Sequence, residues 1–170
     1  MNFSTVQFHI NAYRQHHQTL EAARFLIRSF NLEHPNFASF QIREGEGEPN
    51  NILLTAEGQL GGPTIVKIPK NLFDFDLSLV LNLIAHEMLH VRQKAKDTLV
   101  EDKNEREFQA YYEMLFHPNF PQIPDAPDFN RKQFAQKALT YYQRMAQTPA
   151  LQQAYTAQKN QVEALLHSFS

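Results

Sequence analysis

His86 and His90 lie four residues apart in this chain, and Glu87 follows the first of them. In an α-helix this spacing places both imidazoles on one face, where they can bind a single tetrahedral metal ion. Glu87 lies at the edge of that face, where its carboxylate can reach a metal-bound water without binding the metal itself. Zinc lowers the pKa of such a water, and a neighbouring carboxylate can accept its proton. The spacing therefore predicts zinc-dependent hydrolysis, with Glu87 as the general base.

An apolar segment precedes this motif and predicts a buried helix. Its apolar residues are Leu77, Leu79, Val80, Leu81, Leu83 and Ile84. Asp74 or Asp76 is well placed to cap the helix N-terminus. A helix that is apolar on nearly every face is buried, and polar groups within it need partners. The alternative to a metal site is that both histidines are hydrogen-bonded core residues and that the glutamate pairs with a cation such as Arg92.

A zinc site that stays open to water needs a third protein ligand. No histidine occurs at positions 91–96, so a downstream carboxylate is the better candidate. Glu105 and Glu107 both lie at the start of a second predicted helix. Asp102 could form a capping box with Glu105, and Asn104 could form one with Glu107. Both glutamates also flank the apolar face of that helix at similar angles, so the local pattern does not choose between them.

The motif and the segment Glu107-Phe108-Gln109-Ala110 together resemble the gluzincin metallopeptidases. The similarity is to the group of the membrane CAAX-prenyl and heat-shock-induced proteases, whose second helix carries a glutamate ligand in a Glu-Phe-x-Ala-Asp context. This resemblance implies that His86, His90 and Glu107 bind zinc. It also implies a zincin-like fold, in which the small Ala110 lets the two helices approach closely around the metal.

One residue departs from that family pattern. The aspartate that follows the alanine in the family is Tyr111 here. The hydrogen bond that orients a ligating histidine must therefore come from elsewhere. Gln93, one turn beyond His90 on the same face, can orient a ligand, line the cleft or bond to the neighbouring helix.

Composition sets the class of protein. A chain of 170 residues with 42% hydrophobic residues predicts one globular domain, residues 1–170. The formal charge of −2 gives no electrostatic reason to expect nucleic acid or an anionic membrane as a partner. No cysteine is present, so zinc would be held by nitrogen and oxygen. No apolar segment approaches membrane-spanning length, and we expect a cytoplasmic protein.

Periodicity predicts an α+β fold built in four parts. One long amphipathic helix is expected within residues 1–30, although His16, His17 and Gln18 interrupt its apolar stripe. Residues 37–70 predict a small antiparallel sheet of three short strands, with turns at residues 44–49 and 58–63. The metal-binding helices occupy residues 75–117. Residues 129–169 predict a C-terminal helical hairpin, in which Thr148 and Pro149 begin the last helix.

Two segments next to the metal-binding helices suggest further roles. The strand Thr64–Ile68 is expected either to pair with an extended peptide substrate through its backbone or to be an interior strand with no free edge. Prolines at positions 118, 121, 124 and 127 predict an extended polyproline II connector. The alternative function of this connector is to cross the cleft and restrict access to it.

Other side chains could stabilise the negative charge that develops when water attacks a carbonyl. The candidates are Tyr111, Tyr112, His117 and Arg92. The tyrosines are equally explained as core residues with a bonded hydroxyl, and His117 as a residue that contacts helix-terminal carbonyls.

These patterns predict a zinc-dependent metallopeptidase that acts on a peptide or protein substrate. The main alternative is a non-catalytic zinc-binding domain that serves as a protein-interaction module. Glu87 discriminates between them, because a structural zinc site has no use for an unliganded carboxylate beside the water position. A metal-free helical interaction protein is the third reading, and it predicts no stoichiometric zinc.

Overall fold

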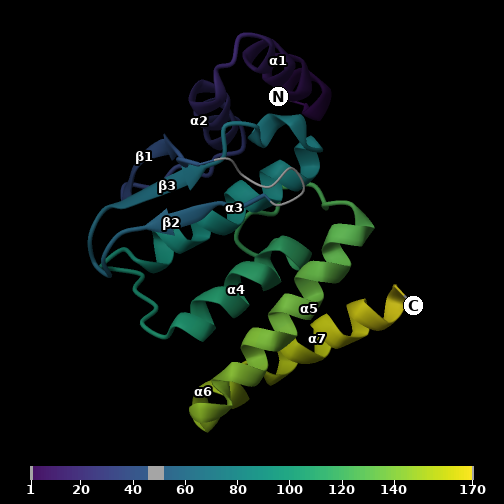
Figure 1. Cartoon of the computed structure of the whole chain (residues 1–170). Coiled ribbons are helices and arrows are strands. Elements are labelled where there is room, and N and C mark those ends of the chain that lie inside the picture. The colour runs from purple at the N-terminus through teal and green to yellow at the C-terminus, as the bar shows by residue number, and fades with distance from the viewer. Residues whose placement is uncertain (1, 46–51, 170) are drawn as a thin grey trace.

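The structure is a computed structural model that describes residues 2–45 and 52–169. It confirms an α+β fold, in which helices surround a small sheet (Figure 1). In chain order, the described elements are α1 (Phe3–Gln15), α2 (Thr19–Ser29), β1 (Phe37–Ile42), β2 (Thr55–Glu57), β3 (Thr64–Ile68), η1 (Leu72–Asp74), α3 (Leu77–Gln93), α4 (Lys103–Phe116), α5 (Asp128–Arg144), η2 (Met145–Gln147), α6 (Pro149–Ala154) and α7 (Thr156–Ser168).

The N-terminal segment forms two helices, and the prediction of one long helix was wrong. The break falls where polar residues interrupt the apolar stripe, and His17 adopts a left-handed conformation with φ of 55°. The N–H of Gln18 donates to the carbonyl of Tyr13, which closes the turn. Folding back lets α1 contribute Val6 and Ile10 to the same core as α2. A single helix of that length would leave much of this apolar stripe in solvent.

The sheet is mixed, which corrects the prediction of an antiparallel sheet. Its strand order is β1-β3-β2; β1 runs parallel to β3, and β2 runs antiparallel to it. The central β3 has no free edge, so the pairing of substrate with Thr64–Ile68 is excluded and the interior reading is confirmed. Of the predicted strand 52–56, only residues 55 and 56 are in the ladder, which continues to Glu57. The turn predicted at 44–49 lies largely outside the described residues.

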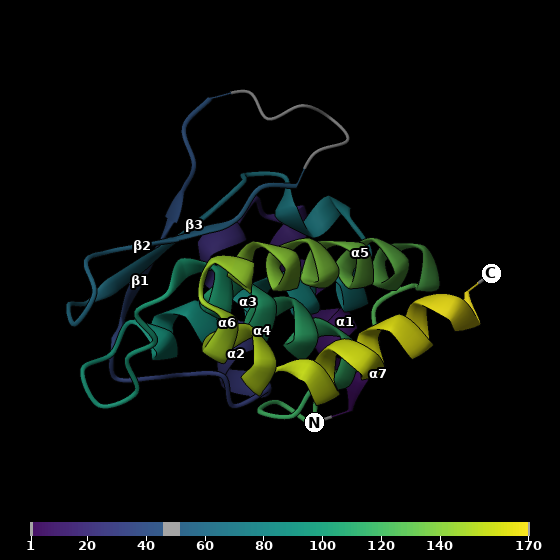
Figure 2. The same cartoon turned by 90° about the horizontal axis from the view of Figure 1, so that it is seen from below.

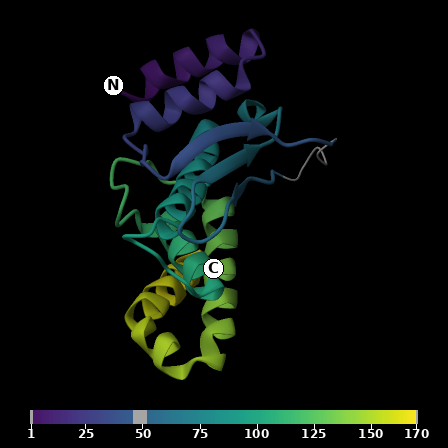
Figure 3. The ribbon, with the colours of Figure 1, turned by 90° about the vertical axis from the view of Figure 1, so that its left-hand side faces the viewer.

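One face of the sheet packs on helices. Thr64, Val66 and Ile68 of β3 are buried, while Ile65 and Lys67 are partly exposed. This alternation follows from the two-residue period of a strand. Figure 3 shows α1 and α2 at one end of the molecule, and the C-terminal helices α5, α6 and α7 toward the other end.

The helix α3 begins at Asp76, whose carboxylate accepts the N–H of Leu79 at 3.1 Å. Of the two predicted caps, Asp76 is therefore the one used. Asp74 instead pairs with Arg14 at 2.7 Å. Most of α3 is buried, including every residue from Ile84 to Val91. This burial confirms the expectation drawn from its nearly continuous apolar sequence.

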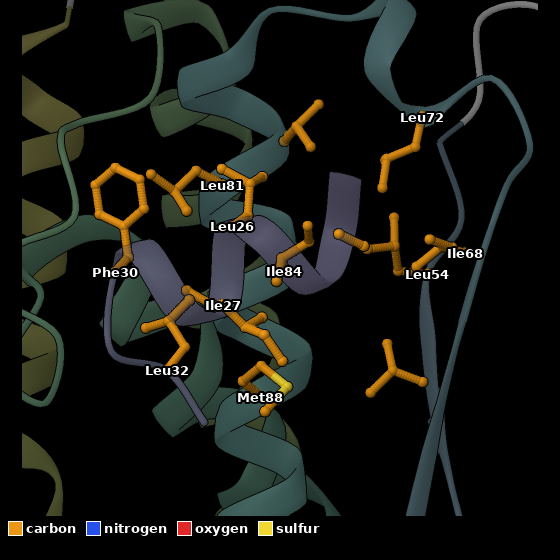
Figure 4. Close-up of a cluster of buried hydrophobic side chains, with 14 of the residues drawn as sticks. Leu26, Ile27, Phe30, Leu32, Leu54, Ile68, Leu72, Leu81, Ile84 and Met88 are labelled. Carbon is orange, nitrogen blue, oxygen red and sulfur yellow. The ribbon is translucent and has the colours of Figure 1, made fainter. Parts of the chain in front are cut away.

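Two hydrophobic clusters enclose α3 and α4. The first cluster joins α1, α2, the sheet and α3; Figure 4 shows Leu81, Ile84 and Met88 of α3 among side chains from α2 and the strands. The second cluster joins α4, α5, η2 and α7, and Figure 2 shows α5 and α7 running side by side. Leu83 of α3 packs against both clusters. The return arm of the C-terminal hairpin is split at Tyr155 into α6 and α7.

The proline-containing connector between α4 and α5 is not a continuous polyproline II segment. The N–H of Ile123 donates to the carbonyl of Phe120, which makes a turn, and both side chains are buried in the first cluster. Asn82 of α3 donates to the carbonyl of Pro124 at 2.8 Å. The connector is thus tied to α3 one helical turn before His86. Within the described parts of the chain, no helix combines the length and hydropathy that a bilayer-spanning segment needs.

The first cluster should dominate the stability of the fold. Leu81 is 0% exposed, so Leu81→Ala removes buried apolar surface and leaves a cavity. We expect it to lower the free energy of unfolding by about 2–5 kcal/mol. Leu60 is 46% exposed, and Leu60→Ala is the matched control, with an expected change within about 0.5 kcal/mol. Urea denaturation of both variants at equal zinc concentration measures the difference; equal losses would contradict this assignment of the core.

Candidate metal centre

Three ligand atoms from α3 and α4 converge in the structure. The Nε2 atoms of His86 and His90 are 3.1 Å apart, and Oε2 of Glu107 lies 3.5 Å from each of them. Zinc ligands at about 2.0–2.2 Å from the ion stand about 3.3–3.6 Å apart at tetrahedral angles. Both distances to Glu107 fall in this range and the distance between the two histidine nitrogens is slightly shorter, so the triangle is close in size to one face of a tetrahedral site and these residues can hold a metal ion.

The hydrogen bonds on the far side of each ring direct the lone pairs inward. Gln93 accepts from Nδ1 of His90 at 2.7 Å, and Nδ1 of His86 faces the sulfur of Met114 at 3.2 Å. A neutral imidazole that donates through Nδ1 presents a lone pair at Nε2. Two such lone pairs then face each other beside a carboxylate oxygen of Glu107. This arrangement needs either a metal ion or a hydrogen-bonding proton at its centre.

The charge balance of the group agrees with this geometry. Burial acts to raise the pKa of Glu107, but hydrogen bonds and charge from His86 and His90 outweigh it and bring that pKa well below its usual range. Burial acts to lower the pKa of His90, and the neighbouring carboxylates of Glu107 and Glu87 reverse this effect and raise it. Each partner thus favours the charged form of the other.

Glu87 lies beside the triangle but outside it. Its side chain is buried at 8% exposure, and the three ligand positions are filled by other residues. Burial raises the pKa of Glu87, although the two histidines and the backbone of Ala56 partly offset this effect. A carboxylate with a raised pKa next to a metal site is suited to accept and return a proton near neutral pH.

Glu105 and Glu107 have different partners, which resolves the choice that the sequence left open. Asp102 caps α4 by accepting the N–H of Glu105 at 2.8 Å. The carboxylate of Glu105 accepts from the hydroxyl of Tyr155 at 2.6 Å, away from the histidines. Glu107 alone of the two reaches the cluster, as the resemblance implied. Ala110 is fully buried at the contact between α3 and α4.

Arg92 does not pair with Glu87, so this part of the metal-free reading is wrong. Its guanidinium lies over the ring of Phe120, 4.4 Å from the centroid. Glu113 supplies the nearby negative charge. Burial lowers the pKa of Lys94 and the charge of Glu87 opposes this effect, so a second cation lies near Glu87. The ammonium of Lys94 donates to the carbonyls of Ala56 and Gly58, and within the described residues no lysine or arginine forms a direct salt bridge with Glu87.

A cleft of about 520 Å³ opens beside the candidate centre. His86 and Glu87 form part of its wall, together with apolar side chains of Leu54, Leu83 and Phe134. A larger cavity of about 960 Å³ lies near α1 and η1 and contains none of the triangle residues. We assign the chemistry to the smaller cleft, because it reaches both a candidate ligand and the unliganded carboxylate. The proline connector does not line this cleft, so its proposed role in restricting access is not supported.

One of the four candidates for charge stabilisation lines the cleft. The ring of Tyr111 packs edge-on against His86, with centroids 4.7 Å apart. Tyr112 donates to Gln161 of α7 instead. His117 contacts Asp125 at 3.2 Å, and the guanidinium of Arg92 lies over the ring of Phe120. Burial, with charge from Glu107, raises the pKa of Tyr111, so its hydroxyl stays protonated and can donate.

The sequence analysis missed two residues around the centre. Met114 contacts Nδ1 of His86, and Gln109 accepts from Gln93 at 2.9 Å. Gln109 is spaced two residues after Glu107, and no local pattern marks it as part of the site. Met114 follows Glu107 by seven residues, which is about two helical turns and therefore the same face of α4. The seven-residue spacing could therefore have indicated that Met114 lies near the candidate centre.

Comparison of the chain with protein-family models, with curated proteins and with solved structures found no match. The resemblance to gluzincins therefore stays a prediction that rests on the motif residues.

The three converging residues predict a specific pattern of metal content. Wild type and Glu105→Ala should each bind one zinc ion per chain, whereas His86→Ala and Glu107→Ala should lose stoichiometric zinc because each lacks a ligand. Elemental analysis after dialysis against zinc buffered well above the wild-type Kd measures this, because a modest loss of affinity on replacing Glu105 then leaves the site filled. Zinc retained by Glu107→Ala but lost by Glu105→Ala would overturn the ligand assignment.

Proposed function

We propose that this chain is a zinc-dependent metallopeptidase whose centre is His86, His90 and Glu107. The observation that carries the proposal is the joint geometry: three potential ligand atoms within 3.5 Å of one another, and a second carboxylate, that of Glu87, buried beside them. Zinc in such a site supplies a water of lowered pKa and polarises a substrate carbonyl.

Side chains of the protein would supply proton transfer, stabilisation of the oxyanion and contacts to the substrate. Glu87 would accept the proton of the attacking water and then donate it to the leaving amine. Tyr111, at the wall of the cleft, would donate a hydrogen bond to the developing oxyanion. The apolar side chains of the cleft would contact the substrate and exclude water.

The free edge of the sheet next to this region belongs to β2. The carbonyl of Ala56 accepts from Lys94 at 3.0 Å, so β2 is tied to the end of α3. The backbone of Ala56 also lies close enough to Glu87 to affect its pKa. An extended substrate that enters the cleft would therefore pass β2, whereas β3 is covered on both edges.

The rival function is a zinc-binding interaction module without catalysis. Its site would be closed to solvent, since structural zinc is normally held by four protein ligands. The described residues supply three ligand atoms at this centre, and the adjoining cleft reaches His86 and Glu87. These two observations favour the hydrolytic function.

Replacing Glu87 separates the two functions. Glu87→Gln keeps the size of the side chain but cannot accept a proton, so it should retain zinc and lower kcat by about 10²–10⁴-fold. Cleavage of a quenched fluorescent peptide library, together with zinc analysis, provides the measurement. Full hydrolysis by zinc-loaded Glu87→Gln, or none by zinc-loaded wild type, would refute the peptidase proposal.

Adjacent tyrosines give a matched pair for the oxyanion role. Tyr111→Phe removes the hydroxyl beside the cleft and should lower kcat by about 10²–10³-fold, with a smaller effect on KM. Tyr112→Phe removes a hydroxyl that bonds to Gln161 and should keep kcat close to wild type. The same steady-state assay compares them, and equal kcat values for both variants would remove Tyr111 from the mechanism.

A further inference from the structure

A chain of hydrogen bonds leads from one candidate zinc ligand to a distant carboxylate. His90 bonds through Nδ1 to Gln93 at 2.7 Å, and Gln93 donates to Gln109 at 2.9 Å. Gln109 donates to the hydroxyl of Tyr155 at 2.6 Å, and Tyr155 donates to Glu105 at 2.6 Å. We call this series of hydrogen bonds the relay. It passes from α3 to α4, reaches the junction of α6 and α7, and ends at Glu105 on the first turn of α4.

The groups at the two ends of the relay determine which group donates and which accepts in each of its hydrogen bonds. A carboxylate such as Glu105 only accepts, so the Tyr155 hydroxyl must donate to it and its oxygen is left to accept from Gln109. Gln93 also donates to the backbone carbonyl of Arg106 at 3.1 Å, which places its amide nitrogen on that side. Its oxygen therefore faces His90 and can only accept. As a result, the proton of His90 is held on Nδ1, and the Nε2 lone pair points at the metal position.

The groups in the chain are held in place by packing. Gln93 is 3% exposed, and the ring of Tyr155 packs against Phe108 with centroids 5.3 Å apart. Burial, together with the hydrogen bond to Glu105, raises the pKa of Tyr155 to about 12, so the hydroxyl keeps its proton. The relay is therefore ordered and complete in the described structure.

We propose that Tyr155 and Glu105 are positioning residues that act on the metal through Gln109, Gln93 and His90. In many zinc sites a carboxylate bonds directly to the ligating histidine, fixes its tautomer and raises its basicity. Here the carboxylate lies three side chains further away, and hydrogen bonds polarised along the relay transmit its charge. The relay takes the place of the aspartate that Tyr111 replaces in the motif.

The position of Tyr155 connects the C-terminal helices to the centre. This residue ends α6 and immediately precedes α7. Gln152 of α6 donates to the carbonyl of Tyr142 in α5 at 3.0 Å, which fixes the turn from which Tyr155 projects. A change in the packing of α6 on α5 would therefore break the relay and weaken metal binding without touching a ligand.

Zinc affinity tests the relay directly. Competition with a chromophoric chelator should show that Gln93→Leu weakens zinc binding by about 10–100-fold, the range for groups that bond a ligating histidine. Tyr155→Phe and Glu105→Gln should each weaken it by less, about 3–10-fold, because they act through intermediates. The double variant should bind no more weakly than either single variant, since each change cuts the same relay.

Tyr142→Phe is the matched control. Its ring packs on the same Phe108 as Tyr155, with centroids 6.0 Å apart, but it takes no part in the relay. It should keep wild-type affinity, and thermal melts of the zinc-free forms show whether all variants fold alike. Unchanged affinity in Tyr155→Phe, or additive losses in the double variant, would overturn the proposal.

The proposal rests on the zinc centre of the proposed function but not on hydrolysis. If wild type binds zinc with the predicted relay effects and cleaves no peptide, the peptidase function fails and the relay stands. If wild type cleaves peptides and the relay variants keep full affinity, the relay fails alone. If wild type binds no zinc, both fail.

Discussion

The structure depends on one electrostatic constraint: two imidazole lone pairs and a carboxylate oxygen meet within 3.5 Å in a largely buried place. Without a metal ion or a proton between them, these acceptors would repel one another and would lack the hydrogen bonds that buried polar groups need. The surrounding residues enforce this convergence. Gln93 and Met114 hold the outer nitrogen atoms of the rings, and the small Ala110 allows α4 to lie close to α3.

The placement of the centre explains the architecture around it. The buried length of α3 carries the two histidines between the hydrophobic clusters, so their positions are fixed by packing on both sides. The cleft opens on the side where Glu87 and Tyr111 lie, between the residues before β2 and the exposed part of α5. The proline connector accepts a hydrogen bond from Asn82 and packs Phe120 under Arg92, and none of its residues lines the cleft.

Much of this could be predicted from the sequence, because the signals were local. The helical spacing of the histidines, the cap at Asp76 and the apolar run of α3 all follow from periodicity and short-range hydrogen bonding. The strand positions of β1 and β3 were also indicated by short β-branched and aromatic runs. These features need no knowledge of distant parts of the chain.

The errors concern contacts between distant segments. Nothing local states that β1 runs parallel to β3, because strand direction depends on how the long connection crosses the sheet. The break at His17 was visible only as a polar gap in a stripe, and its left-handed backbone depends on the packing of α1 on α2. Tyr155 reaches Gln109 across 46 positions, so no spacing rule could have found it. The local pattern also left Glu105 and Glu107 equivalent, and the resemblance distinguished them before the geometry did.

The sharing of Leu83 between the two hydrophobic clusters has a consequence for the chain as a whole. The clusters meet where α3 and α4 touch, and an ion held by His86, His90 and Glu107 would join them there. In a protein without cysteines, that ion would serve as a reversible cross-link between the two halves. Its binding energy would add to the cooperativity of folding, because the unfolded chain cannot assemble the three ligands. Loss of the ion would then weaken the contact between α3 and α4 before either hydrophobic cluster unfolds.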